Sequence, residues 1–517
     1  MKPDELSDAI GGIDKELVEE ADRTRKNKKQ KRWIKLAALA ACFCIAVSAV
    51  LGAPYLKENF TGKINITPEQ TKTNDTTPTE KIKNDSVTAK SPLIAKPLSM
   101  EYNAVYPKVV QCPDETDYIN MNGTLNYEAF DKAFTEWRDY QKSRTHLPDG
   151  YVGDMSGFYR TIVQKLLLDE KGKNATCSPS NIYMALSMLA EVTDSNSRRQ
   201  ILDLLGAKNV EQLRAQAKAV WESSYENDSQ GTLILGNSFW LSDTFKYKEA
   251  PFRTLMNSYY ASGFAGEMGS DTLNKKLQDW INEQTGGLLA EQAKSAETDP
   301  STVLALVSTV YFKGQWNEKF MTDETKKNTF HGADGDTQCD FMYQKASECG
   351  YLDSDGFKAV SKSFIDGSTM YFILPDSGKP EKLIENGKAI DLVLNPESFS
   401  DSNLTVNLAM PKFDVTSDID LKKSLIQLGV TDIMDSDKSD FSPMTDMGGI
   451  YCSSAKHAAR VTVDEEGCKA AAFTMMTADS AACVELKEVD FTLDRPFVFA
   501  ITNADGLPLF FGIVNNI

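Results

Sequence analysis

The sequence predicts one large α+β domain that follows an apolar anchor and a polar linker. Three observations carry this prediction. A charge-free apolar run at 36–53 lies directly after a basic block, and a stretch rich in Thr, Lys, Asn, Asp and Pro follows it. From about residue 100 to 517, segments of helical and strand-like patterning are interspersed, as in a mixed fold with large sheets.

The composition excludes several classes of function. The chain has 517 residues, with 56 Lys or Arg against 74 Asp or Glu and a net charge of −18. A nucleic-acid-binding protein needs a basic surface, so that partner is not expected. With only His146, His331 and His457, and no GxxxxGK[ST], HExxH, GxSxG or CxxC motif, the sequence indicates no enzyme, cofactor or metal site.

The N-terminal region has the pattern of a membrane anchor. Residues 23–35 hold eight Lys or Arg and no acid, and the run from 33 to 56 is just long enough to span a bilayer. The positive-inside rule places the head, residues 1–32, in the cytoplasm and the rest of the chain outside. A cleaved signal peptide and a lipoprotein cleavage at Cys42 remain alternative interpretations.

The chain beyond the anchor divides into three parts. Residues 57–100 have too few apolar side chains to fold alone and are interpreted as a disordered linker. Residues 101–150 are an N-terminal extension, partly helical and without an assigned role, and 151–517 form the main domain. The periodicity predicts helices in 155–168, 182–189 and 273–282, and strands in 303–312, 369–374, 404–410 and 497–501.

A collinear series of motifs in the main domain resembles the serpin family. The series runs from about 150 to 517, and its members are Asn174-x-x-x-Ser178-Pro179, Asn237-Ser238-Phe239-Trp240-Leu241, Trp280-Ile281-Asn282 with Thr285-Gly286, Val303 to Val307 leading to Tyr311-Phe312-Lys313-Gly314-Gln315-Trp316, Met410-Pro411-Lys412-Phe413, Leu425-x-x-Leu428-Gly429-Val430-x-Asp432, Val463 to Thr474, Phe491-x-x-Asp494-Arg495-Pro496-Phe497, and Pro508 to Val514. Any one of these motifs alone would be a weak indication, but their shared order is not.

The resemblance implies a serpin fold with three β-sheets, about nine helices and an exposed reactive-centre loop. It implies a suicide inhibitor of serine proteases, with cysteine proteases as a further target class, that acts as a monomer. After cleavage, the loop inserts as a new strand into the central sheet and carries the acylated protease along. The whole chain is therefore expected to be a bacterial, single-pass membrane protein with its serpin domain outside the cell.

The predicted loop has the alternation that insertion requires. The resemblance implies a hinge made of Glu465, Glu466, Gly467, Cys468, Lys469, Ala470, Ala471 and Ala472. From Cys468 to Ser480, every second side chain is small or apolar and uncharged, and no proline interrupts the run. The family's spacing places the reactive bond at Ala481-Ala482, within a window from Ser480 to Cys483. Small residues there fit elastase-like or subtilisin-like proteases.

The resemblance also implies two regions that control sheet opening. The shutter would contain Asn174, Ser178, Pro179, Asn181, Ser308 and His457, and the breach would contain Trp316. Asn181 and Ser308 exchange the polar types that are usual in the family. This exchange and Cys468, where Thr or Ser is usual, keep open a non-inhibitory serpin that serves as a surface binding or sensing module. A Cys468–Cys483 disulfide that blocks insertion is a further alternative.

Overall fold

The computed structural model describes residues 101–121, 123–346, 349–396, 399, 404–468 and 487–517. The predicted head, anchor and linker therefore lie outside the described residues, as do the loop residues 469–486. Within the described ranges, no helix is both long enough and apolar enough to cross a bilayer.

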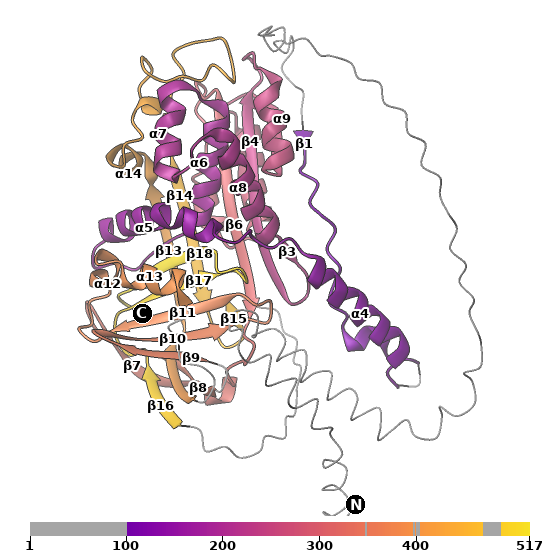
Figure 1. Ribbon diagram of the computed structural model, residues 1–517, viewed down its shortest axis with the longest axis vertical. Helices are drawn as coiled ribbons and strands as arrows, with labels where there is room; N and C mark the ends of the chain where they lie inside the picture. Colours follow the sequence, from indigo (N-terminus) through magenta and orange to yellow (C-terminus); the bar gives the residue numbers. More distant parts are fainter. Residues whose placement is uncertain (1–100, 122, 347–348, 397–398, 400–403, 469–486) are drawn as a thin grey trace, which may run out of the picture. The chain divides into compact units, whose positions relative to one another are not determined.

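An eight-stranded central sheet dominates the fold (Figure 1). Its strand order is β1 (Glu101–Tyr102), β5 (Ala261–Gly266), β4 (Gly231–Ser242), β6 (Leu304–Gln315), β15 (Gly467–Cys468), β14 (Lys456–Val463) and β13 (Phe413–Asp420), with β3 (Glu226–Asn227) paired to β4. β15 is antiparallel to both of its neighbours. β6 and β14 are consequently parallel to each other, and the two residues of β15 lie between them.

Two further sheets lie beside the central one. The six-stranded sheet has the order β2 (Ala175–Cys177), β18 (Pro508–Val514), β17 (Phe497–Thr502), β11 (Thr369–Pro375), β10 (Phe357–Ser363) and β9 (Gly350–Ser354). The four-stranded sheet has the order β16 (Lys487–Thr492), β12 (Leu404–Pro411), β8 (Gly335–Ala346) and β7 (Lys326–Gly332). The described residues thus contain the three sheets that the resemblance implied.

Eleven α-helices accompany the sheets in the part of the chain that the structure describes. In chain order they are α4 (Tyr127–Ser143), α5 (Tyr151–Asp169), α6 (Pro179–Val192), α7 (Ser195–Leu205), α8 (Val210–Ser224), α9 (Glu249–Ser258), α10 (Asp271–Gln284), α11 (Ala290–Ala293), α12 (Glu381–Glu385), α13 (Lys388–Leu394) and α14 (Leu421–Gln427). The described residues therefore hold more than the expected nine, because α11 and α12 are single short turns and α4 belongs to the extension.

The alternation of β4 separates two hydrophobic cores. Phe239 and Leu241 point into the main core, where α6, α8 and α9 pack, whereas Trp240 points to the opposite face. There Trp240 stacks on Phe264 of β5, with ring centroids 4.2 Å apart, beneath Leu277 of α10. α10 is thus fastened to its own face of the sheet by a small separate core.

The predicted elements are present with bounds extended by a few residues. The helices expected at 155–168, 182–189 and 273–282 are α5, α6 and α10, and the four expected strands are β6, β11, β12 and β17. α6 begins where the sequence places Pro at the first helical position, and the side chain of Ser178 caps it by accepting a hydrogen bond from the Asn181 amide.

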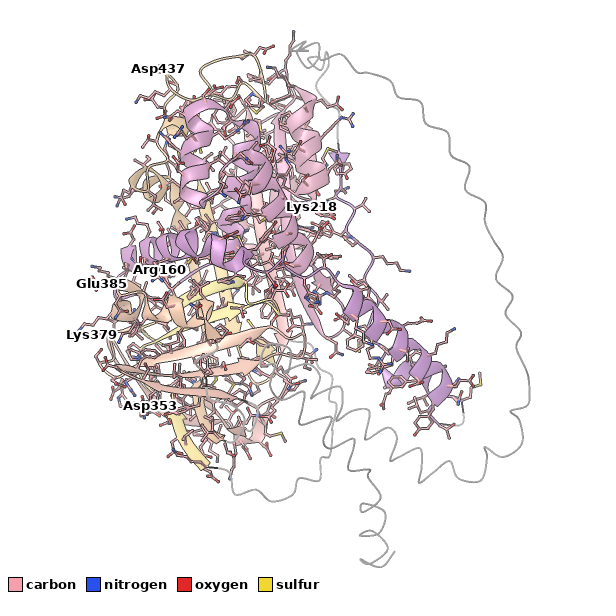
Figure 2. All side chains as sticks on the ribbon, viewed as in Figure 1. Arg160, Lys218, Asp353, Lys379, Glu385 and Asp437 are labelled. Atoms are coloured by element: carbon pink, nitrogen blue, oxygen red, sulfur yellow. The ribbon has the colours of Figure 1, made fainter. Side chains whose placement is uncertain are left out.

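Charged side chains of both signs project outward from several elements (Figure 2). Labelled examples are Lys218 on α8, Asp353 on β9 and Lys379 before α12, all of them exposed. Exposed ion pairs such as Lys275–Asp279, with side chains 72% and 59% exposed, contribute little to stability. The fold therefore depends mainly on its two apolar cores.

Candidate functional site

The candidate site is the gap between the parallel strands β6 and β14. Among the described residues, no ladder of hydrogen bonds joins these two strands directly. β15 occupies one end of the gap, where Cys468 pairs with Gly314 of β6 and Val463 of β14. The chain thus already begins a strand at the position where the reactive loop would be inserted.

Gly467 is required by the close approach of two backbones. A Cβ atom added to Gly467 would lie 2.1 Å from the carbonyl oxygen of Gly314. Any side chain would therefore push β15 away from β6. Cys468, the next residue, is 4% exposed and belongs to the main core, and burial raises the pKa of its thiol to about 12. A protonated, buried thiol of this kind behaves as a small apolar side chain.

Two ion pairs hold the turn that precedes β15. Lys412 lies 2.6 Å from Glu465, and Lys319 lies 2.6 Å from Glu466. Burial alone would raise the pKa of Glu465, but hydrogen bonds from Lys412 and from Thr325, at 2.7 Å, outweigh it and hold that pKa below its usual value. Both predicted hinge acids therefore anchor the turn through lysine partners.

Trp316 lies at the same end of the gap. It is fully buried, its indole Nε1 donates to the carbonyl of Asp464 at 3.0 Å, and its backbone amide donates to the carbonyl of Glu466. Its ring stacks on Phe364 with centroids 4.3 Å apart, and Lys362 Nζ lies 5.4 Å from its centroid. The structure thus brings the predicted breach residue into contact with the predicted hinge.

A buried polar network crosses the other end of the gap. Asn181 of α6 donates from Nδ2 to Ser308 Oγ on β6 at 3.0 Å, and its Oδ1 lies 3.2 Å from His457 Nδ1 on β14. The backbone amide of Ser178 donates to His457 Nε2 at 2.9 Å. Because Nε2 accepts that bond, the proton of the neutral ring is on Nδ1 and is donated to Asn181.

His457 is uncharged in this network. Burial lowers the pKa of its imidazole to about 4, since the fully enclosed site disfavours the charged form. The exchanged pair, Asn181 and Ser308, still makes a direct hydrogen bond across the interface between α6 and β6. A single amide side chain therefore connects β6 to β14.

The structure does not bring every predicted shutter residue into this network. Pro179 is buried at the start of α6, beside it. Asn174, however, lies elsewhere: its side chain binds the backbone of Asn515 and Asn516 at 2.7 to 2.9 Å. It fixes the end of β18 to the start of β2, and among the described residues it makes no hydrogen bond to β6 or β14.

Several predicted residues fall outside the described residues. These are Lys469, Ala470, Ala471 and Ala472 of the hinge, the reactive pair Ala481 and Ala482, and the window residues Ser480 and Cys483. The proposed Cys468–Cys483 disulfide therefore stays untested.

Sequence analysis missed the cations of the site. Lys412 and Lys319 hold the hinge acids, and Arg460 of β14 binds Asp414 of β13 and donates to the carbonyl of Leu288 at 3.3 Å. Lys412 follows the buried end of β12 in the motif Met410-Pro411-Lys412-Phe413, so a charge at the border of an apolar run was an available signal. Nothing in the local pattern of Lys319 or Arg460 marks them.

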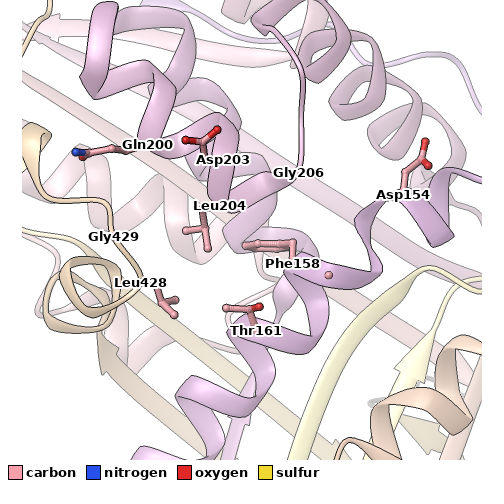
Figure 3. Close-up of a pocket in the computed structure, with 10 residues that line it drawn as sticks. Asp154, Phe158, Thr161, Gln200, Asp203, Leu204, Gly206, Leu428 and Gly429 are labelled. Atoms are coloured by element: carbon pink, nitrogen blue, oxygen red, sulfur yellow. The ribbon is translucent and has the colours of Figure 1, made fainter.

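An open cavity of about 520 Å³ lies between α5, α7 and the segment after α14 (Figure 3). Phe158 and Thr161 of α5, Leu204 of α7 and Leu428 are among the residues that line it. None of its lining residues is a predicted site residue, and it has no part in the gap between β6 and β14.

Comparisons with known proteins agree with this geometry. A family model described as Serpin (serine protease inhibitor) matches residues 155–517. Leukocyte elastase inhibitor A of Mus musculus is 29% identical over 354 residues, which cover 66% of this chain and 92% of the relative. The leukocyte elastase inhibitor of Sus scrofa is 30% identical over 339 residues, or 63% and 89% of the two chains.

Solved structures share the fold. The thermophilic serpin tengpin in its native state superposes with a TM-score of 0.62 at 24% identity, over 72% of this chain and 96% of its own. AtSerpin1 of Arabidopsis, in its native stressed conformation, gives a TM-score of 0.61 at 24% identity, over 71% and 98%. The family match covers residues 155–517, and β15 begins a third strand between β6 and β14. This chain therefore belongs to the serpin family, a family of serine protease inhibitors rather than catalysts.

Proposed function

We propose that this chain traps serine proteases of the elastase-like or subtilisin-like kind by inserting its cleaved reactive loop between β6 and β14. The observation that carries this proposal is the position of β15. Gly467 and Cys468 already form the first two residues of a strand in that gap, antiparallel to both neighbours. The chain that follows can continue the same strand without any change of register.

The side chains after Cys468 fit this path. Because Cys468 points into the main core, Ala470, Ala472 and every second residue onward would point the same way. In the full strand, each new backbone hydrogen bond adds a net of about 0.5 to 1.5 kcal/mol. About a dozen such bonds give a free energy comparable to the whole stability of a domain, which is enough to distort a captured protease.

Capture begins as an ordinary acyl transfer from the reactive loop to the protease serine. The protease serine oxygen attacks the carbonyl carbon of Ala481, an ester bond forms, and the bond to Ala482 breaks to release a free amine. Insertion of the loop then distorts the protease before water can hydrolyse the ester, so the covalent complex persists. The small residues of the Ser480–Cys483 window fit a shallow primary pocket, and relatives named leukocyte elastase inhibitor support that target class.

The same proposal places the domain outside the cell on a single-pass anchor at 33–56, with the head in the cytoplasm. The sequence pattern supports this arrangement. A basic block at 23–35 precedes the charge-free run at 36–53, and the positive-inside rule keeps the more basic flank of such a run in the cytoplasm.

The test is covalent trapping by the full chain in mild detergent. It is mixed with an elastase-like and a subtilisin-like serine protease and analysed on a denaturing gel. The mass of the released fragment is then measured by mass spectrometry. A stable high-mass band with a fragment that begins at or beside Ala482 supports the proposal. Cleavage in the same window, with no complex and with the protease still active, would instead support the alternative. That alternative is a non-inhibitory serpin that serves as a binding or sensing module, which the unusual Cys468 favours.

A further inference from the structure

The N-terminal extension follows the outer edge of the central sheet. It precedes the family match, which begins at residue 155. Its first residues pair with β5 as β1, and the amide of Ala104 donates to Ser262 Oγ at 3.0 Å. Farther along, Gln111 donates to the carbonyl of Asn227 at 2.9 Å. Figure 1 shows this segment as it runs from β1 past β3 to α4.

The extension is attached to α10 in both halves of that helix. Glu101 forms an ion pair of 2.8 Å with Lys276, and the hydroxyl of Tyr106 donates to Gln284 Oε1 at 3.1 Å. The ion pair is exposed and weak, but the ring of Tyr106 packs against Trp221 of α8 with centroids 5.2 Å apart. Tyr106 is therefore the firmer of the two attachments.

α10 and the residues after it bridge the gap where the loop would insert. Gly286 lies against β6, since a Cβ on it would be 2.7 Å from the ring of Tyr311. Two residues later, the carbonyl of Leu288 accepts the hydrogen bond from Arg460 of β14. A continuous set of contacts thus runs from Tyr106 through Gln284 and the segment after α10, across β6, to β14.

A second attachment lies at the hinge end of the sheet. Trp137 Nε1 and Gln141 Nε2, both on α4, donate to Asp228 Oδ2 at 2.9 and 3.2 Å. Arg144 lies 3.0 Å from Glu226 of β3, with side chains only 16% and 8% exposed. Burial raises the pKa of the Glu226 carboxyl to about 8 although Arg144 lowers it, so the contact acts as a buried hydrogen bond from the guanidinium. Loss of Arg144 leaves the buried carboxyl without this donor, which is costly.

This second attachment adjoins the hinge through two strands. Asp228 caps the turn before β4 by accepting from the amides of Gln230 and Gly231. Gly231 of β4 is paired with Gly314 of β6, and Gly314 is in turn paired with Cys468 of β15. The extension therefore holds the outer strands of the sheet at the point where insertion begins.

We propose that residues 101–147 form a strap that restrains the separation of β6 from β14 and so sets the rate of loop insertion. A new strand must move β14 away from β6, which requires the Arg460–Leu288 contact to break or α10 to shift. The strap opposes the shift of α10, because it ties that helix to the outer edge of the sheet. Tyr106 and Arg144 are its positioning residues. The effect on insertion rests on the proposed function, whereas the restraint itself does not.

Hydrogen exchange of the full chain in detergent, without protease, tests the restraint. The strap variants are Tyr106→Phe, which keeps the ring and loses the bond to Gln284, and Arg144→Gln. The matched control is Arg214→Gln, which breaks the 2.7 Å pair with the buried Glu191 behind the sheet. We expect amides of α10, β6 and β14 to exchange at least about fivefold faster in both strap variants, and at the wild-type rate in the control.

Two results would overturn the strap: faster exchange confined to residues 101–147, or equal rates in the strap variants and the control. Complex formation with an elastase-like protease then separates this inference from the proposed function. Faster exchange with no complex in any variant refutes trapping and leaves the strap intact. Complexes that form at the wild-type rate in variants with unchanged exchange refute the strap and leave trapping intact.

Discussion

The two ends of the gap between β6 and β14 are built from different chemistry. At the hinge end the strands are already parted, β15 lies between them, and Lys412 and Lys319 hold the turn by charge. At the other end the strands are joined through Asn181, which bonds Ser308 on one side and His457 on the other without any charged group. Under the proposed function, the first end would start insertion and the second would resist its completion.

Because of this difference, salt and pH should affect different ends of the gap. Ion pairs with an exposed partner respond to salt and to neutralising substitutions. A buried neutral network responds to protonation and to loss of single hydrogen bonds. The predictions below can therefore break or sharpen the distinction between the two ends.

The end of the gap that holds Asn181, Ser308 and His457, here called the network end, should lose stability first in acid. The folded-state pKa of His457 is about 4, below its ordinary value of 6.5, so the unfolded chain binds the proton first as the pH falls. The contribution of neutral His457 to the free energy of unfolding is thus fully present above pH 6.5. It decreases by about 3 kcal/mol as the pH falls to 4. Urea unfolding of the wild type and of His457→Gln, measured between pH 7 and 4, checks this. Equal losses in both proteins would show that His457 is not the cause.

At the hinge end, Lys412→Gln should cost about 2 kcal/mol, because it leaves the carboxylate of Glu465, 8% exposed, without its cation. Lys319→Gln is the matched control, since Glu466 is 37% exposed and can return to water. It should cost less than about 1 kcal/mol. Thermal unfolding at low and at high salt measures both, and a larger loss for Lys319→Gln would reverse the assignment of the main anchor.

Loss of the bridging amide should change mobility more than stability. Asn181→Ala and Asn174→Ala each remove buried hydrogen bonds at about 1 kcal/mol per bond. Of these two residues, only Asn181 connects β6 to β14, so only its loss should speed hydrogen exchange in those strands. If Asn174→Ala accelerates them equally, the gap is not controlled by the network end.

Much of this comparison could be predicted from the sequence. Gly467 and Trp316 stand in motifs whose order identifies the family, and the resemblance assigned Asn181, Ser308 and His457 to the shutter. The structure brings the first two to one end of the gap and the other three to the other end. The strands and helices were predictable because their side-chain periods are strong and local.

What could not be predicted depends on contacts between distant residues. The Lys319–Glu466 pair spans 147 positions, and the Arg144–Glu226 pair spans 82. A two-residue strand such as β1 has no period at all. Asn174 shows the same limit. It shares a motif with Ser178, four positions away, but its side chain binds the backbone of the C-terminal Asn515 and Asn516. Local patterns identify elements, whereas partners follow only from the fold.

The most direct test of insertion compares two neighbouring arginines in the loop. In the proposed inserted strand, Ala472→Arg would place a charge on the face that continues from the buried Cys468, whereas Ala471→Arg would place the same charge on the opposite face. The measurement is the fraction of an elastase-like protease that each full-length variant converts to a gel-stable complex. The account predicts that Ala472→Arg is cleaved without trapping and that Ala471→Arg traps as the wild type does. Equal trapping by both variants would contradict insertion of the loop between β6 and β14.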